Sequence, residues 1–159
     1  MSDNSKQKNT FTKIRNAKKT DSKKIIKLIK ELAVFEKLAQ PDKKAAKRLL
    51  KDAFSKNPLF QLLTIEYDNK IAGYVIYYFT YSSFLAKRSL YLEDIFISEK
   101  YRNKGIGKSV FRKLIKIAKK KECGRIEWIV LDWNQNAINF YDNLGAQHLH
   151  DWKTYRISL

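Results

Sequence analysis

The chain has 159 residues, of which 44% are hydrophobic, and this predicts one domain that buries roughly two-thirds of its unfolded surface. One cysteine and two histidines exclude a disulfide framework and argue against a zinc site, so we expect no metal. No apolar run approaches the ~20 residues of a membrane span. We therefore expect a soluble, cytoplasmic protein with no membrane partner, a disordered tail over residues 1–10 and one domain over residues 11–159.

The net charge of +17 raises nucleic acid as a partner. The lysines are spread from Lys6 to Lys153 and fall mostly on predicted solvated helix faces, while the aromatic residues lie in apolar strands. This distribution favours ordinary surface charge, and a basic nucleic-acid-binding module remains the alternative.

The first third of the chain predicts a strand followed by two helices. Alternation over residues 11–17 indicates the strand. Thr20 or Asp21 can cap a helix with apolar residues at helical spacing, and Pro41 with Asp42 opens a second helix.

Strands dominate the middle of the chain, and the pair Asp68-Asn69 predicts a two-residue hairpin turn. Gly145 stops a short later helix. The expected elements after the first two helices are strands 59–67, 70–82 and 90–97, a basic helix from about 106 to 121, a strand 125–133, a helix 134–144 and a last strand 151–159.

Two acidic residues interrupt the apolar strand 90–97. Strict alternation places Asp94 on the face of Leu90, Leu92 and Phe96, and Glu93 on the other face. Carboxylates in such a run are costly unless they are used, so we expect Glu93 and Asp94 to have different functions.

The turn from Arg102 to Gly107 follows this strand and precedes the basic helix. Gly105 and Gly107 can adopt positive φ, which lets consecutive N–H groups converge on an anion such as a phosphate. The spacing fits neither a dinucleotide fingerprint nor a P-loop.

This turn resembles the pyrophosphate loop [Q/R]-x-x-G-x-[G/A] of the GNAT N-acetyltransferases. A second motif of that family is matched by Asn134, Ala137, Tyr141 and Gly145. The resemblance implies a mixed α/β GNAT fold with a twisted sheet of about six to seven strands and about four helices.

Several segments, among them KELAVFE, LYLEDIF and VLDWNQNAINFY, resemble the diamine acetyltransferase subgroup, which includes spermidine/spermine and thialysine acetyltransferases. This implies transfer of an acetyl group from acetyl-CoA to a primary amine of a small cationic acceptor, by direct attack in a ternary complex within a homodimer. The alternative enzyme is a protein or peptide N-acetyltransferase.

The resemblance also assigns the residues that contact acetyl-CoA. Asn134 would bind the pantetheine arm, although it can equally be a helix N-cap. The predicted cofactor-binding residues are Ile95, Phe96, Ile97, Arg102, Asn103, Lys104, Gly105, Ile106, Gly107, Lys108, Asn134 and Tyr141.

Glu93 is the candidate base, acting directly or through water, because an alkylammonium with pKa ~10.4 must lose a proton before attack. The alternative is structural pairing of Glu93 with a lysine. Tyr141 is the candidate acid for the leaving thiolate, and its alternative is simple packing.

The predicted substrate-binding residues are Glu36, Glu93, Asp94, Asp132 and Trp152. Glu36 and Asp132 could instead be ordinary surface charges, and Trp152 would reach the acceptor across a dimer. Polyamine-specific relatives place an acid and a tryptophan where this chain has Ser82 and Phe84, which favours thialysine, lysine-like amino acids or short diamines over spermine.

Overall fold

The computed structural model describes residues 11–159, so the predicted tail over 1–10 lies outside the described residues. The chain divides into two compact units, one ending at Ile129 and the other running from Val130 to Leu159. The single domain predicted for residues 11–159 stays a prediction. The α-helices and strands are β1 (Thr12–Asn16), α1 (Ser22–Phe35), α2 (Lys43–Ala53), β2 (Gln61–Tyr67), β3 (Lys70–Ser82), β4 (Lys87–Ile97), α3 (Ile106–Lys120), β5 (Arg125–Glu127) and α4 (Gln135–Asn143).

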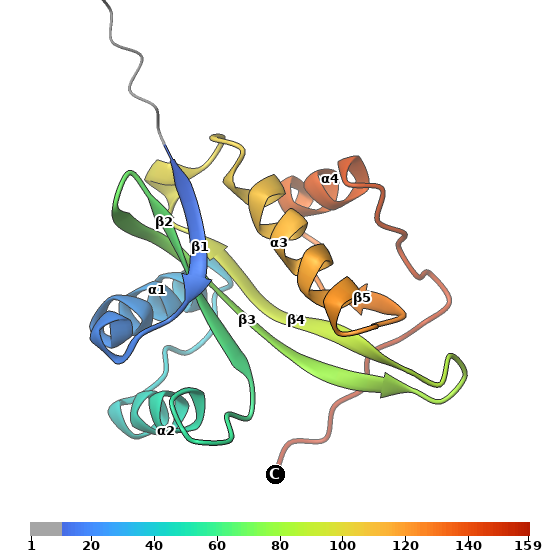
Figure 1. The fold of residues 1–159 in the computed structure, drawn as a ribbon, viewed down its shortest axis with the longest axis horizontal. Coiled ribbons are helices and arrows are strands. Elements are labelled where there is room, and N and C mark those ends of the chain that lie inside the picture. The colour runs from blue at the N-terminus through green and yellow to red at the C-terminus, as the bar shows by residue number, and fades with distance from the viewer. Residues whose placement is uncertain (1–10) are drawn as a thin grey trace, which may run out of the picture. The chain divides into compact units, whose positions relative to one another are not determined.

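The first unit is built on a mixed five-stranded sheet in the order β1-β2-β3-β4-β5 (Figure 1). Neighbouring strands are antiparallel except β4 and β5, which are parallel. Asp68 and Asn69 both have positive φ, 53° and 58°, as the predicted hairpin turn requires. The predicted mixed α/β class is thus confirmed, with fewer strands than the six to seven expected.

Helices cover this sheet because its strands are apolar on both faces. Ile25 and Leu28 of α1 pack with Tyr74 and Phe96 of the sheet, and part of α2 joins them. Val75, whose side chain points to the opposite face, is also fully buried. The amphipathic helix α3 contacts β1, β4 and β5 through its buried apolar residues.

Strand β4 contains a bulge at Glu93. In the pairing of β4 with β3, Ile76 lies opposite Asp94 and Tyr77 lies opposite Leu92, so Glu93 is one residue in excess. The alternation of side chains predicted through residues 90–97 is therefore broken at this point.

The bulge brings the two acidic side chains of β4 to the same face. Tyr74 and Tyr78, four residues apart on β3, share a face, and their hydroxyl groups donate to Asp94 and Glu93, respectively. The prediction that these acids point to opposite faces is wrong, because it assumed a regular strand.

The second unit contains α4, which begins after Asn134 and ends before Gly145 as predicted. Gly145 has φ +79°, the left-handed conformation typical of the residue after a helix. The strand predicted over 125–133 ends at Glu127, and residues 151–159, predicted as a strand, form none. The side chains from Asp151 to Leu159 are all exposed, and a β-pattern forms a strand only where it finds a pairing partner.

Candidate active site

Asp94 of β4 carries a half-buried carboxylate. The Tyr74 hydroxyl donates to Asp94 Oδ2 at 3.1 Å, and Tyr74 itself is fully buried. Burial raises the pKa of Asp94 to about 6; the tyrosine hydrogen bond opposes the shift, and the charges of Glu93 and Glu36 add to it. Asp94 therefore carries a charge at neutral pH that its surroundings disfavour.

Glu93 lies beside Asp94 but is exposed. The Tyr78 hydroxyl donates to Glu93 Oε2 at 3.2 Å, and the Tyr78 ring lies 5.2 Å from that of Tyr91. Burial, with the charge of Glu93, raises the pKa of Tyr78 to about 12, so this hydroxyl keeps its proton and remains a donor. Glu93 is thus held by a donor and still reaches solvent.

Glu36, immediately after α1, completes the group. Its backbone N–H donates to Leu32 O, which fixes it at the end of the helix, and burial raises the pKa of its half-buried carboxyl group. The charge of Glu36 acts on both Tyr74 and Asp94. We call Glu36, Glu93 and Asp94 the acid cluster.

The charges of Glu93 and Glu36 both raise the pKa of Asp94, so an ammonium group that bound at this cluster would relieve their repulsion. The sequence identified all three residues, and the structure brings them together. The sequence did not identify Tyr74 and Tyr78, which donate to Asp94 and Glu93, or Tyr91, whose ring lies beside that of Tyr78. A tyrosine in an apolar strand was the available signal, since a buried hydroxyl needs a partner. Glu127 was also missed; its charge acts on Tyr91, and it pairs with Arg125 at 3.0 Å.

The edge of β4 next to the acid cluster is open within the first unit. β5 pairs only with Ser89, Leu90 and Tyr91, so no described strand up to Ile129 extends this pairing along Glu93–Ile97. The backbone around Ile95 and Phe96 there could hold an extended ligand by β-type hydrogen bonds. The Ile97 carbonyl already accepts from Arg102 Nε at 3.0 Å.

The glycine turn leads into α3 with the geometry of an anion-binding helix start. Gly105 is the N-cap with φ +72°, and Asn103 also has positive φ at 59°. Gly107, the second residue of the helix, does not use the positive φ that a glycine allows. Helix geometry leaves the first N–H groups without carbonyl partners in the helix, among them those of Ile106 and Lys108. A phosphate fits this arrangement.

Two basic side chains of the loop lie on aromatic rings. The Arg102 guanidinium lies over Phe35 and Phe96, 5.3 and 5.7 Å from the ring centroids, and the Lys104 ammonium lies 5.8 Å from the centroid of Tyr67. Arg102 therefore connects the loop to the last turn of α1.

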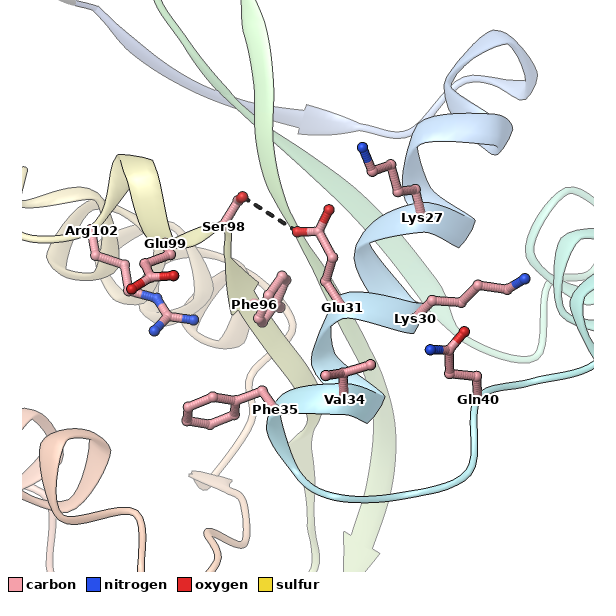
Figure 2. Close-up of a pocket in the computed structure, with 10 residues that line it drawn as sticks. All are labelled: Lys27, Lys30, Glu31, Val34, Phe35, Gln40, Phe96, Ser98, Glu99 and Arg102. Atoms are coloured by element: carbon pink, nitrogen blue, oxygen red, sulfur yellow. Dashed lines mark hydrogen bonds between the residues drawn. The ribbon is translucent and has the colours of Figure 1, made fainter.

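A groove of about 620 Å³ opens beside Arg102 (Figure 2). Figure 2 shows Ser98, Glu99 and Arg102 on one side of it, with further residues coming from α1. Glu31 of α1 accepts from the Ser98 hydroxyl at 3.3 Å. The lining residues are Lys27, Lys30, Glu31, Val34, Phe35, Gln40, Phe96, Ser98, Glu99 and Arg102.

The remaining predicted site residues lie in the second unit. Asn134 Oδ1 accepts from the backbone N–H of Ala137 at 3.3 Å, so the N-cap interpretation of Asn134 is confirmed, and its amide NH₂ is the group that could donate to a ligand. The rings of Tyr141 and Phe140 are 5.5 Å apart in an edge-to-face arrangement. Asp132 and Trp152 are exposed.

Comparison with known proteins decides the family. The model of the acetyltransferase (GNAT) family matches residues 25–146. The chain belongs to this family. The predicted resemblance and the predicted class of enzyme, an N-acetyltransferase, are thereby confirmed.

Curated relatives of this GNAT acetyltransferase include both branches of the predicted subgroup. Thialysine N-epsilon-acetyltransferase of Mus musculus is 38% identical over 156 residues, which cover 91% of each chain. Spermidine/spermine N(1)-acetyltransferase-like protein 1 of Homo sapiens is 35% identical over 158 residues, 93% of this chain and 23% of that protein. Among solved structures, a possible acetyltransferase from Clostridium difficile 630 has a TM-score of 0.80 at 20% identity, with 93% and 97% of the two chains covered, which supports the fold.

No helix in residues 11–159 is long and apolar enough to cross a membrane. In the same part of the chain, no group of three or more histidine, cysteine or acidic residues is arranged to hold a metal ion.

Proposed function

We propose that this protein is a cytoplasmic, acetyl-CoA-dependent N-acetyltransferase that acetylates a primary amine of a small cationic acceptor. The observation that carries the proposal is the acid cluster beside the open edge of β4. Glu36 and Asp94 are half-buried and their carboxyl pKa values are raised, so their negative charges are poorly compensated. An ammonium group would bind there and compensate them. The glycine loop that suits a pyrophosphate follows directly in the chain.

Glu93 accepts the proton that the amine must lose, directly or through water. Its exposure lets it pass this proton to solvent, whereas Asp94 and Glu36 are better placed to hold the substrate. Tyr78 orients Glu93 through its hydroxyl. The free amine then attacks the thioester directly, with both substrates bound.

The loop and the helix start position acetyl-CoA, which supplies the activated acetyl group. N–H groups at the start of α3, with Arg102, Lys104 and Lys108, would hold the pyrophosphate, and the helix dipole contributes ~0.3–1 kcal/mol per favourable charge. The backbone of β4 near Ile95 would bind the pantetheine arm. Asn134 would bind the same arm.

Tyr141 donates a proton to the leaving thiolate. A tyrosine hydroxyl with a reference pKa ~10 is protonated at neutral pH, which the role requires.

We propose an acceptor of the thialysine, lysine-like or short diamine type. Support comes from Ser82, which is buried and accepts from the Leu85 N–H at 3.3 Å, so it offers no charge to a polyamine. Phe84 is 98% exposed and replaces the tryptophan of polyamine-specific relatives. The name of the mouse relative points in the same direction. Asp132 would provide a further counter-charge for the acceptor.

Thermal melting with acetyl-CoA, followed by initial-rate kinetics with an amine, tests the proposal. Ligand at 100 times its dissociation constant should stabilise the fold by about 2.7 kcal/mol, and rate plots at varied acetyl-CoA should intersect if a ternary complex forms. Absence of any melting shift at all concentrations would overturn the proposal, and salt-sensitive RNA or DNA binding would then favour a nucleic-acid-binding module.

We further propose a homodimer, in which Trp152 of one chain approaches the acceptor site of the other. A monomer in analytical ultracentrifugation at micromolar concentration would contradict both parts of this proposal.

A further inference from the structure

The side chain of Arg102 joins the glycine loop to two aromatic residues beside the acid cluster (Figure 2). Its Nε donates to the Ile97 carbonyl at 3.0 Å, and its guanidinium carbon lies 5.3 Å from the ring centroid of Phe35 and 5.7 Å from that of Phe96. Within residues 11–159 the two Nη groups donate to no protein atom, so they can bind a phosphate. Arg102 can therefore hold the cofactor without leaving these rings.

Phe35 is the last residue of α1 and directly precedes Glu36, a member of the acid cluster. The end of the helix is closed by backbone hydrogen bonds. The N–H of Glu36 donates to the Leu32 carbonyl at 2.9 Å. The N–H of Leu38 donates to the Ala33 carbonyl at 2.8 Å. Because this helix end is held together, the position of the Phe35 ring limits where the Glu36 carboxylate can lie.

Phe96 provides a second connection from Arg102 to the acid cluster. It is buried in β4, two residues after Asp94. Its ring lies 6.4 Å from that of Tyr74, whose hydroxyl donates to Asp94. The guanidinium of Arg102 thus lies against the neighbours of two members of the acid cluster.

A hydrogen bond attaches α1 to the start of the loop one turn earlier. The Ser98 hydroxyl donates to Glu31 at 3.3 Å, and Ser98 directly precedes the short 3₁₀ helix Glu99–Tyr101 that leads to Arg102 (Figure 2). Glu31 and Phe35 are four residues apart and share one side of α1. The loop and the last turns of α1 are therefore connected at two points.

We propose that Phe35 is a positioning residue through which acetyl-CoA, bound at Arg102, raises the affinity of the acid cluster for the acceptor amine. A phosphate on the Nη groups fixes the guanidinium, and the fixed guanidinium holds the Phe35 ring. The end of α1, with Glu36, is then ordered before the amine arrives. Ordering the site costs less when the amine binds, which gives positive cooperativity between the two ligands. This inference rests on the proposed function and adds how its two substrate sites are coupled.

Equilibrium binding measures this coupling without turnover, with coenzyme A, which has no acetyl group to transfer, and cadaverine as a short diamine. In isothermal titration calorimetry of the wild-type protein, saturating cadaverine should lower Kd for coenzyme A about fivefold or more. Coenzyme A should lower Kd for cadaverine by the same factor, because linkage between two binding sites is reciprocal. In Phe35→Leu this factor should fall towards one, while Kd for coenzyme A alone stays close to the wild-type value. Phe35→Tyr keeps the ring and should keep the coupling.

Tyr67→Leu is the matched control. It removes the ring beside Lys104, the second basic residue of the loop that lies on an aromatic side chain, 5.8 Å from the ring centroid. Tyr67 belongs to β2, which carries no member of the acid cluster. This variant should therefore keep the coupling factor even where its Kd for coenzyme A rises.

Amide hydrogen exchange gives a second measurement that does not depend on affinity. Coenzyme A should slow exchange at the N–H groups of Glu36 and Leu38 in the wild-type protein and in Tyr67→Leu, but not in Phe35→Leu. A melting curve of each variant shows that the fold is kept.

Several results would overturn the inference. Equal Kd values for coenzyme A with and without cadaverine would show that the two sites are independent, and a higher Kd with cadaverine would show that phosphate and rings compete for Arg102. Coupling that survives in Phe35→Leu, or that is lost equally in Tyr67→Leu, would remove Phe35 from this role. If coenzyme A or the amine does not bind the wild-type protein at all, the proposed function fails as well. If both bind independently, the proposed function stands and only this inference fails.

Discussion

Two groups of acidic residues lie in the first unit, and they are arranged in opposite ways. In the first, Arg15 binds Asp21 at 2.7 Å and Glu66 at 2.6 Å, and Asp21 also accepts from the Lys18 N–H. The hydrogen bond from Arg15 holds the pKa of Asp21 below its usual range. In the second group, the acid cluster, the Tyr74 hydroxyl donates to Asp94, and burial raises the pKa of Asp94.

The difference indicates which group stabilises the fold and which is available for a ligand. Arg15 of β1 pairs with Asp21, just before α1, and with Glu66 of β2, so one of its two ion pairs joins residues 51 positions apart in sequence. The acid cluster is stabilised by hydrogen bonds from neutral donors, which leave its negative charge uncompensated. A bound cation can neutralise this negative charge. Carboxylates with raised pKa values cluster at functional sites.

The largest expected effect comes from Glu93→Gln, which keeps the shape of the side chain and removes the proposed base. At neutral pH kcat should fall by roughly 10²–10⁴-fold, and activity should recover in part as the pH approaches the amine pKa of ~10.4. Steady-state kinetics across pH measures both. Glu122→Gln, an exposed acid outside both groups, is the control, and a loss that does not recover at high pH would assign Glu93 to binding.

Arg15→Gln should separate stability from catalysis. It leaves Asp21 and Glu66 without their cation, which we expect to lower the free energy of unfolding by roughly 3 kcal/mol, while kcat of the remaining folded enzyme is kept. Urea unfolding with Lys13→Gln as the exposed control on the same strand measures the effect. Unchanged stability would contradict the structural role given to this group.

Asp94→Asn should do the reverse and stabilise the fold. The folded pKa of about 6 lies above the unfolded value of 3.8, so ionised Asp94 opposes folding at neutral pH. Partial solvent exposure reduces the effect to roughly 1–2 kcal/mol. Melting curves should show a higher Tm together with a higher acceptor KM, whereas Asp21→Asn should lower Tm. Loss of stability in Asp94→Asn would contradict the account of the cluster.

The smallest effect is the pH dependence of acceptor binding. As the pH falls through about 6, Asp94 takes up a proton and the cluster loses charge, so acceptor KM should rise. The contribution of Asp94 to stability follows the opposite course, since it is present at low pH and is lost as the pH rises through about 6. In Asp94→Asn the rise of KM near pH 6 should disappear, and its persistence would assign the titration to another group.

Local features of this fold were predictable from the sequence, and features that depend on distant partners were not. Asp68-Asn69 fixed the hairpin by its own backbone preference, and Asp42 caps α2 through the N–H of Ala45. The bulge at Glu93 depends on how β4 pairs with β3, which no periodicity within β4 reveals. Residues 151–159 form no strand for the same reason, because a strand needs a pairing partner that its own sequence pattern does not reveal.

The site residues follow the same division. Family resemblance identified Glu36, and the apolar strand around them identified Glu93 and Asp94, but the convergence of the three needs the bulge and the end of α1. The roles of the tyrosines were missed because each depends on a partner in another strand. Tyr74, for example, donates to a residue 20 positions away.

The bulge at Glu93 also makes the site sensitive to the number of residues in β4. A substitution at Glu93 changes one charge, but deletion of this residue removes the excess position and would restore a regular pairing of β4 with β3. Sequences that differ here by one codon in length could keep the same sheet and core while carrying one carboxylate fewer in the acid cluster. An alignment that places a gap at Glu93 would therefore mark the loss of the proposed base rather than a change of fold.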